Sequence, residues 1–204
     1  MNIVYATDDN GALGTGVSIV SLMENLPPGV HADIYIMTGG LSGDNTARFH
    51  SLQQGYNLHL HFIDMKDKYT DFPVGSKWSE ATYYRLGLAG ELPATVERAL
   101  YVDIDTIFNR DISPMYESEF GDCLIAGVFT TEDLSEESFS RWKREMNLDR
   151  SSIYINAGVI LYHIGRIREE CFESQVLSWA KNNIHRLSWQ DQDILNVCYQ
   201  QRIL

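Results

Sequence analysis

The stretch NIVYATDDN, at residues 2–10, opens the alternation of strand and helix that decides the fold. Residues 2–6 are a short apolar run of strand-forming side chains, and the polar and glycine residues at 7–11 end it as a loop. The next apolar residues recur at helical spacing until Pro27, which predicts an amphipathic helix. The chain therefore begins as strand, loop and helix.

This alternation continues through the first 64 residues. Strands are expected at residues 32–37 and 58–63, with a helix between them that Ser42 caps and that runs to about Gln54. Strands connected in this order by right-handed helical crossovers lie parallel in one sheet, with helices on its faces. Beyond them we expect strands at 99–102 and 124–129, a strongly apolar stretch at 153–163, and helices at 79–88, 135–146, 164–183 and 190–199.

The length and composition fit one domain. The chain has 204 residues, of which 44% are hydrophobic and 22% charged, so it can bury a full core without disulfides or a structural metal ion. Because no linker, repeat or low-complexity segment interrupts it, residues 1–204 are expected to form a single domain. Residues 202–204 resemble the start of a further strand, which suggests that the domain continues beyond them.

The charge balance argues against a nucleic-acid partner. Asp and Glu number 28 against 16 Lys and Arg, and the resulting net charge of -12 repels polyanions. An anionic ligand would then need a positive group at its site, for which a divalent metal ion is the natural candidate. The three cysteines form no C-x-x-C pair, and neither a signal sequence nor a membrane-spanning apolar run is present, which predicts a cytoplasmic protein.

The strongest chemical signal is the pair Asp103 and Asp105, directly after the apolar strand at 99–102. Side chains two residues apart on a strand point to the same side, so both carboxylates can face one ligand. Ligands of open α/β sheets bind beyond the carboxyl ends of the strands, and paired carboxylates suit Mg²⁺ or Mn²⁺. Such an ion could bridge the oxygens of a diphosphate leaving group. A solvated turn with two aspartates is the alternative interpretation.

Other polar residues lie where a ligand could meet them. Asp8 and Asn10 follow the first strand, on the same rim as the carboxylate pair, where they could bond a base or ribose or simply build a turn. Asp191 and Gln192 open a helix, where they could recognise sugar hydroxyl groups, work at an anomeric carbon or cap the helix. Arg85 lies on a predicted helix, where an arginine more often faces solvent or forms a salt bridge.

Two further patterns have both a structural and a chemical interpretation. His59 and His61 share a strand face, which suits a metal-binding pair but is equally typical of a packed or edge strand. Gly158 lies in the middle of the apolar stretch at 153–163, which indicates a bulge or a close approach of another group to the backbone.

Five stretches taken together resemble the family 8 retaining glycosyltransferases, the group that includes glycogenin and bacterial lipopolysaccharide galactosyl- and glucosyltransferases. They run through nearly the whole chain in the family order: NIVYATDDN at 2–10, ATYYRLGLAGELP at 81–93, ALYVDIDTI at 99–107, YINAGVILYHI at 154–164 and WQDQDILN at 189–196. Each stretch alone is a weak signal, whereas five in register are specific.

The resemblance implies an α/β GT-A fold, a Rossmann-like and mostly parallel sheet flanked by helices that binds a nucleotide sugar. It implies retaining transfer of galactose or glucose from a UDP-hexose to a saccharide, lipopolysaccharide or other glycolipid acceptor, assisted by Mn²⁺ or Mg²⁺. By motif, Asp103 and Asp105 would bind the metal ion, and Asp191 and Gln192 would be the catalytic residues near the anomeric carbon. The residues that would contact the donor are Ala6, Asp8, Asn10, Arg85, Ile104, Asn156 and Ala157.

The sequence departs from the family pattern in two places. Gly11 stands where the family commonly has an aromatic residue that stacks on the base. The chain also ends before the family's late H-x-x-G-x-x-K-P-W segment, whose histidine is a third metal ligand and whose lysine meets the diphosphate. We therefore expect a nucleotide-sugar-binding domain that is truncated at its C-terminus, with any peripheral membrane contact made through the missing segment.

Two other functions stay open at this point. The run ALYVDIDT also fits the D-x-D-x-T motif of haloacid dehalogenase-type phosphatases, with Asp103 as nucleophile and Asp105 as acid and base. That motif normally opens its domain, whereas three predicted strands precede it here. The other alternative is a non-catalytic domain that only binds a nucleotide sugar.

Overall fold

The computed structural model, which describes residues 1–74, 79–129, 136–148 and 152–204, has a six-stranded sheet at its centre, in the order β3-β2-β1-β4-β6-β5. The strands are β1 (Asn2–Ala6), β2 (Ala32–Thr38), β3 (Leu58–Asp64), β4 (Ala99–Val102), β5 (Ile125–Phe129) and β6 (Ile155–Tyr162). The strands β3, β2, β1 and β4 run parallel to one another, while β6 runs antiparallel to both β4 and β5. The sheet is therefore mostly parallel, as the sequence predicts.

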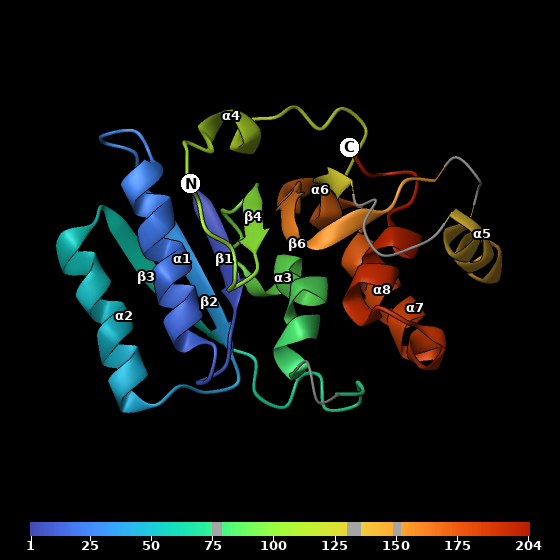
Figure 1. The fold of residues 1–204 in the computed structure, drawn as a ribbon, viewed down its shortest axis with the longest axis horizontal. Helices are drawn as coiled ribbons and strands as arrows, with labels where there is room; N and C mark the ends of the chain where they lie inside the picture. The colour runs from blue at the N-terminus through green and yellow to red at the C-terminus, as the bar shows by residue number, and fades with distance from the viewer. Residues whose placement is uncertain (75–78, 130–135, 149–151) are drawn as a thin grey trace.

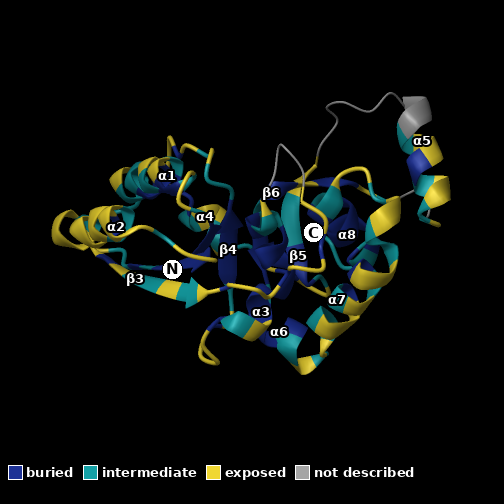
Figure 2. Cartoon of the chain, turned by 90° about the horizontal axis from the view of Figure 1, so that it is seen from below, coloured by how far each residue is buried: buried dark blue, intermediate teal, exposed yellow. Residues whose placement is uncertain are grey.

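Helices cover both faces of this sheet (Figures 1 and 2). On one face, α1 (Ala12–Asn25) and α2 (Gly43–Gly55) pack over β1, β2 and β3 through a buried cluster that includes Leu22 and Phe49. The other face is covered by the 3-10 helix η1 (Glu80–Gly87), α3 (Leu88–Glu91), α6 (Ile164–Glu169), α7 (Phe172–Asn183) and α8 (Gln190–Cys198). The remaining short elements are α4 (Ser113–Tyr116), α5 (Glu136–Glu145) and η2 (Ile184–Arg186).

The two faces have separate hydrophobic cores. Along β1, Ile3 and Tyr5 enter the core beneath α1 and α2, whereas Val4 and Ala6 enter the core beneath the other helices. The inner strands are accordingly buried on both sides (Figure 2), which explains why they appear in the sequence as continuous apolar runs. Polar side chains with a chemical role can then emerge only where the strands end.

The helices differ from the sequence-based expectations in three places. The single helix expected at 164–183 is broken into α6 and α7, because Cys171 adopts the left-handed conformation with φ of 50°. The segment expected as a helix at 79–88 is mostly 3-10. The four-residue helix α4 was not expected. The helix expected at 135–146 spans Glu136–Glu145, and residue 135 lies outside the described residues.

The last residues behave as the sequence indicates. Ile203 forms an isolated parallel bridge with Ile125, and the N–H of Leu204 donates to the carbonyl of Ile125 at 2.9 Å. These contacts place the last residues beside β5 as an isolated bridge. Within the described ranges, no helix combines the length and the hydropathy that crossing a bilayer would require.

Candidate functional site

The eleven residues predicted to contact the donor or the metal ion gather at one edge of the sheet, where β1 and β4 end and the antiparallel strand β6 begins. A cleft of about 930 Å³ opens there between the loop after β1, helix η1 and the segment after β4. Seven of the eleven predicted site residues line this cleft: Ala6, Asp8, Asn10, Arg85, Asp103, Ile104 and Asp105.

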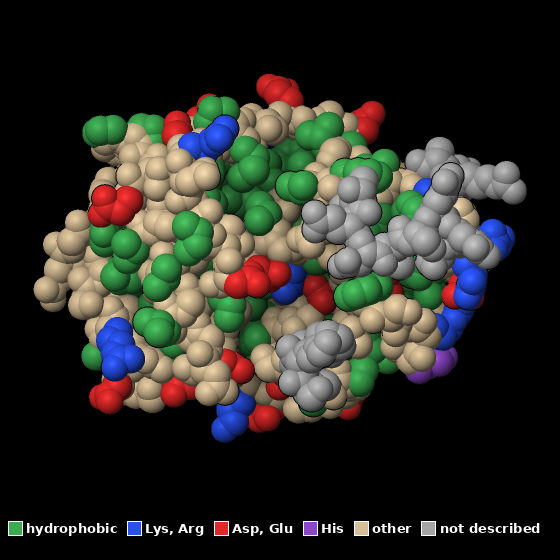
Figure 3. All heavy atoms as spheres, viewed as in Figure 1, with side chains coloured by type: hydrophobic (Ala, Val, Ile, Leu, Met, Phe, Trp, Pro, Cys, Tyr) green, Lys and Arg blue, Asp and Glu red, His purple; other side chains and the backbone are tan. Residues whose placement is uncertain are grey.

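A smaller pocket of about 200 Å³ adjoins the cleft, since Thr82, Arg85 and Asp103 line both. The remaining four predicted residues lie in its wall: Asn156, Ala157, Asp191 and Gln192. In Figure 3 a basic side chain lies between acidic ones in the hollow at the centre of the face. The structure therefore brings all eleven predicted residues to two adjoining cavities.

Arg85 is the buried cation at the junction of the two cavities, and only 5% of it is exposed. Its Nη2 donates to Oδ1 of Asp103 at 2.8 Å, and its Nε lies 3.0 Å from Oδ2 of Asp191. The guanidinium carbon lies 4.2 Å from the centre of the Tyr101 ring. Burial alone would lower the pKa of Arg85, but Asp191, with further negative groups around it, holds that pKa above its ordinary value. A planar, permanently charged fork can hold two carboxylates at once.

Asp191 is the second buried charge of the site, 7% exposed and in the first turn of α8. Burial raises the pKa of Asp191 to about 6, although the adjacent Arg85 acts in the opposite direction, and the nearby Asp103 adds to the increase. The carboxyl group therefore changes its charge close to neutral pH. A group with this property at a ligand pocket is typical of a functional site.

Asp103 is fixed by three contacts. Its Oδ1 accepts hydrogen bonds from Arg85 and from the hydroxyl of Tyr101, the latter at 3.1 Å, and its backbone N–H donates to the carbonyl of Gly158 at 2.7 Å. A Cβ atom at Gly158 would lie 2.9 Å from Oδ2 of Asp103. The close approach predicted for Gly158 is therefore confirmed, and the Asp103 carboxylate and the amide oxygen of Asn156 are the groups that approach.

The D-x-D pair fits a divalent metal ion by its donor atoms. Asp103 is partly exposed and Asp105 is exposed, and both line the larger cleft. Carboxylate oxygens are the ligands that Mg²⁺ and Mn²⁺ prefer. Among the described residues, neither Asp103 nor Asp105 belongs to a set of three or more acidic, His or Cys side chains whose ligand atoms lie within 4.8 Å of one another. The remaining ligands at this pair would thus come from water or from a bound diphosphate.

The two aspartates of the loop after β1, Asp8 and Asp9, make different contacts. Oδ1 of Asp8 accepts from the N–H of Gly11 at 2.9 Å, which is turn geometry, while Asp8 and Asn10 both line the cleft. Asp9 instead reaches the start of α2, where its Oδ1 accepts from the N–H of Ser42 at 2.7 Å. The turn interpretation and the ligand interpretation of this loop are therefore compatible.

Gly11 has a structural explanation of its own. A Cβ atom there would meet Cδ1 of Ile104 and Oγ1 of Thr7, each at 2.7 Å. A larger side chain at this position would have to displace the residue between the two aspartates. Ile104 thus occupies space, at the end of the cleft formed by the loop after β1, that a side chain at position 11 would need.

Gln192 is held in the pocket wall at both ends of its amide. Its Oε1 accepts from the N–H of Ala157 at 3.0 Å, and its Nε2 donates to the hydroxyl of Tyr154 at 3.2 Å. Tyr154 in turn donates to the buried Asp193 at 2.7 Å, whose other oxygen accepts from two backbone N–H groups just before α8. This chain of hydrogen bonds fixes the start of α8 against β6.

Sequence reasoning missed several residues that hold the site in place. Tyr101 lies two residues before Asp103 on the same strand, so strand alternation could have indicated it. Tyr154 and Asn196 carried no local signal, because their partners Asp193 and Ile155 are 39 and 41 residues away in the sequence. Such contacts become visible only once the chain is folded.

Comparison with known proteins gives one consistent family. The sequence profile of Glycosyl transferase family 8 matches residues 2–204. The lipopolysaccharide 1,3-galactosyltransferase of Salmonella typhimurium is 28% identical over 204 residues, which cover 96% of this chain and 58% of that protein. The lipopolysaccharide 1,2-glucosyltransferase of Escherichia coli K12 is 28% identical over 200 residues, 97% of this chain and 57% of that protein. The chain thus spans less than two thirds of the length of these two transferases.

The solved structures agree with the sequence comparison. The crystal structure of galactosyltransferase LgtC in complex with donor and acceptor sugar analogues is 28% identical, with a TM-score of 0.86 that covers 100% of this chain and 72% of that one. The GT-A fold expected from the sequence is therefore confirmed. Since the family profile and the fold both extend over the described residues, the chain belongs to glycosyl transferase family 8.

Proposed function

We propose that this domain binds a UDP-hexose and transfers its galactose or glucose to a saccharide or glycolipid acceptor, with retention at the anomeric carbon and with the help of Mn²⁺ or Mg²⁺. The observation that carries the proposal is the buried Arg85, which holds Asp103 of the D-x-D pair and Asp191 at the junction of two adjoining cavities. Family membership and the two lipopolysaccharide hexosyltransferases among the relatives support it.

The larger cleft suits the nucleotide part of the donor. Asp8 and Asn10 lie at the end formed by the β1 loop, where a carboxylate and an amide can bond a base or a ribose, with Ala6 and Ile104 beside them. The net charge of -12 repels a diphosphate, so a positive group is needed between it and the protein. A metal ion held by Asp103 and Asp105 would supply that charge and stabilise the diphosphate as a leaving group.

The smaller pocket suits the hexose. Asn156, Asp191 and Gln192 present an amide, a carboxylate and a second amide around about 200 Å³, polar groups of the kind that sugar hydroxyls require. Retaining transfer develops positive charge at the anomeric carbon, which a nearby carboxylate or amide oxygen stabilises. Gln192 is a neutral group locked by Ala157 and Tyr154, and Asp191 is locked by Arg85, so both are pre-positioned for this role.

The alternatives make different predictions. Membership of family 8 leaves the phosphatase interpretation of Asp103 and Asp105 without support. The non-catalytic alternative predicts that the protein binds a UDP-hexose and releases nothing from it. The transferase proposal predicts metal-dependent release of UDP from UDP-glucose or UDP-galactose, slowly to water and faster when a suitable saccharide is present.

The experiment measures UDP release from each donor with Mn²⁺, with Mg²⁺ and with a chelator, and compares wild type with Asp105→Asn and Gln192→Ala. We expect both variants to lower the rate by a factor on the order of 100, because each removes a group placed at developing charge. Arg48→Lys, an exposed change on α2, is the matched control and should leave the rate unchanged. Donor binding without any release of UDP would contradict the proposal and favour the binding domain.

A further inference from the structure

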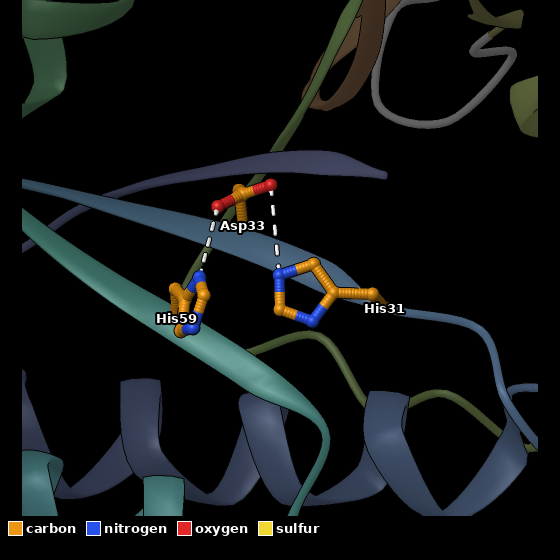
Figure 4. Close-up of side chains that lie close together, drawn as sticks. All are labelled: His31, Asp33 and His59. Carbon is orange, nitrogen blue, oxygen red and sulfur yellow. Dashed lines mark ion pairs between the residues drawn. The ribbon is translucent and has the colours of Figure 1, made fainter.

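A second polar cluster lies at the amino-terminal ends of β2 and β3, the sheet edge opposite the donor cleft. It comprises His31 just before β2, Asp33 on β2 and His59 on β3. Asp33 and His59 are direct register partners in the parallel pair, and His31 lies two residues before Asp33. Figure 4 shows the three side chains converging on one side of the sheet, with the Asp33 carboxylate between the two imidazoles.

The spacing of the ligand atoms suits a small cation. Nε2 of His31 lies 3.7 Å from Oδ2 of Asp33, and Nδ1 of His59 lies 3.8 Å from Oδ1. One oxygen of Asp33 and one nitrogen of each of the two histidines all lie within 4.8 Å of one another, a spacing that no other such set among the described residues achieves. Ligand atoms around tetrahedral Zn²⁺ lie about 3.3 Å apart. The side chain of His59 is 70% exposed, so its ring can close this gap without disturbing the core.

Neighbouring side chains orient two of these ligands. The amide oxygen of Asn57 lies 3.1 Å from Nδ1 of His31, an arrangement that places the proton on Nδ1 and leaves the lone pair of Nε2 facing Asp33. Nε2 of His61 lies 2.9 Å from Oδ1 of Asp33, and the His61 ring stacks on Tyr35. Histidine ligands of metal ions characteristically have such a second partner, because it fixes the tautomer and the ring orientation.

We propose that His31, Asp33 and His59 bind a divalent transition metal ion, for which Zn²⁺ is best suited, at a site separate from the donor cleft. Two imidazole nitrogens and one carboxylate favour Zn²⁺, whereas the all-oxygen pair Asp103 and Asp105 favours Mn²⁺ or Mg²⁺. Three protein ligands leave one position for water. The bound ion links β2 to the edge strand β3 and stabilises the folded chain, since the unfolded chain does not hold these ligands together.

The concentration of histidines supports this proposal. The chain has six histidines, and three of them, His31, His59 and His61, surround the single carboxylate of Asp33.

The test measures Zn²⁺ affinity by competition with a chromogenic chelator, together with thermal unfolding with and without Zn²⁺. The variants are His59→Gln, whose side chain is mostly exposed, and His31→Gln. His185→Gln, in η2, is the matched histidine control, and Asp105→Asn removes a ligand of the donor site instead. We expect one Zn²⁺ per wild-type chain and a dissociation constant at least tenfold higher in each cluster variant.

The controls separate this site from the donor site. His185→Gln and Asp105→Asn should bind Zn²⁺ as wild type does, and Zn²⁺ should raise the unfolding temperature of both. Equal Zn²⁺ affinity in wild type and in both cluster variants would overturn the proposal. Loss of the tight site in Asp105→Asn alone would also overturn it, since the ion would then belong to the donor cleft.

Discussion

Nη2 of Arg85 lies 2.8 Å from Oδ1 of Asp103, so a buried guanidinium holds the first carboxylate of the proposed metal pair. The Nε atom of the same side chain lies 3.0 Å from Asp191 in the smaller pocket. The metal end and the sugar end of the proposed donor site therefore share one cation. Because residues in one network are energetically coupled, a change at either carboxylate should affect the other.

Replacing Arg85 should affect stability and donor binding to different extents. Arg85→Ala leaves Asp191 buried without its partner, and breaking such a pair costs about 3–5 kcal/mol of unfolding free energy. Arg85→Lys keeps the charge but cannot hold both carboxylates, so we expect a smaller loss of stability and at least tenfold weaker Mn²⁺-dependent UDP binding. Urea unfolding and calorimetric titration measure the two quantities. An Arg85→Ala variant as stable as wild type would refute the role given to this ion pair.

Gly158 tests whether the position of the Asp103 carboxylate matters. In Gly158→Ala the new Cβ would lie 2.9 Å from Oδ2 of Asp103 and 2.9 Å from Oδ1 of Asn156, so these side chains must move and metal-dependent UDP binding should weaken at least tenfold. The matched control is Gly16→Ala in α1, where a Cβ meets nothing within 4 Å and helix propensity predicts a gain of about 0.5–1 kcal/mol. Unchanged UDP affinity in Gly158→Ala would show that the carboxylate position is not critical.

The raised pKa of Asp191 predicts the pH dependence of the reaction. Burial raises this pKa to about 6, so the carboxyl group is ionised above that pH and protonated below it. If the ionised form holds Arg85 and faces the donor sugar, the rate of UDP release should fall as the pH is lowered through about 6. Measured rates from pH 4.5 to 8 test this. A rate that stays constant across pH 6, with the protein folded throughout, would contradict the assignment.

On stability, Asp191 should have the opposite pH dependence, because its contribution to the unfolding free energy should increase as the pH is lowered. The unfolded chain loses this proton near pH 4, whereas the folded chain keeps it until about pH 6, so the folded state binds more protons in between. The contribution of Asp191 to the unfolding free energy is therefore largest below pH 4 and falls by about 3 kcal/mol as the pH rises through 6. The difference in unfolding free energy between wild type and Asp191→Asn, followed from pH 4 to 7, reports it. If this difference does not change with pH, the carboxyl group of Asp191 is not buried in the folded protein.

The strands and the rim of the site were predictable because both follow from local patterns. Buried strands such as β1 and β4 appear as apolar runs, and the aspartates that follow them must lie at the carboxyl edge of a parallel sheet. Arg85 illustrates the limit of that reasoning. Its sequence context fits either a salt bridge or a place in a ligand site. The structure shows ion pairs with Asp103 and Asp191 and places Arg85 in the walls of both cavities, whereas its contact with a donor stays a prediction.

Features that depend on distant partners were not predictable. The left-handed conformation of Cys171, which ends one helix and begins another, interrupts an apolar spacing that is continuous in the sequence. Asp193 lies in the first turn of α8, yet it also holds Tyr154, which positions Gln192 from across the pocket. The partners of these groups are set by the packing of α8 against β6 rather than by neighbouring residues.

Thermal unfolding with UDP, in the presence and absence of Mn²⁺, tests the central claim most directly. A ligand at about 100 times its dissociation constant adds about 2.7 kcal/mol to the stability of the folded state, which is easily detected. We expect a higher unfolding temperature only when UDP and Mn²⁺ are present together, and no increase in Asp103→Asn/Asp105→Asn. A shift that UDP alone produces, or one that the double variant retains, would contradict a metal-dependent donor site at these two carboxylates.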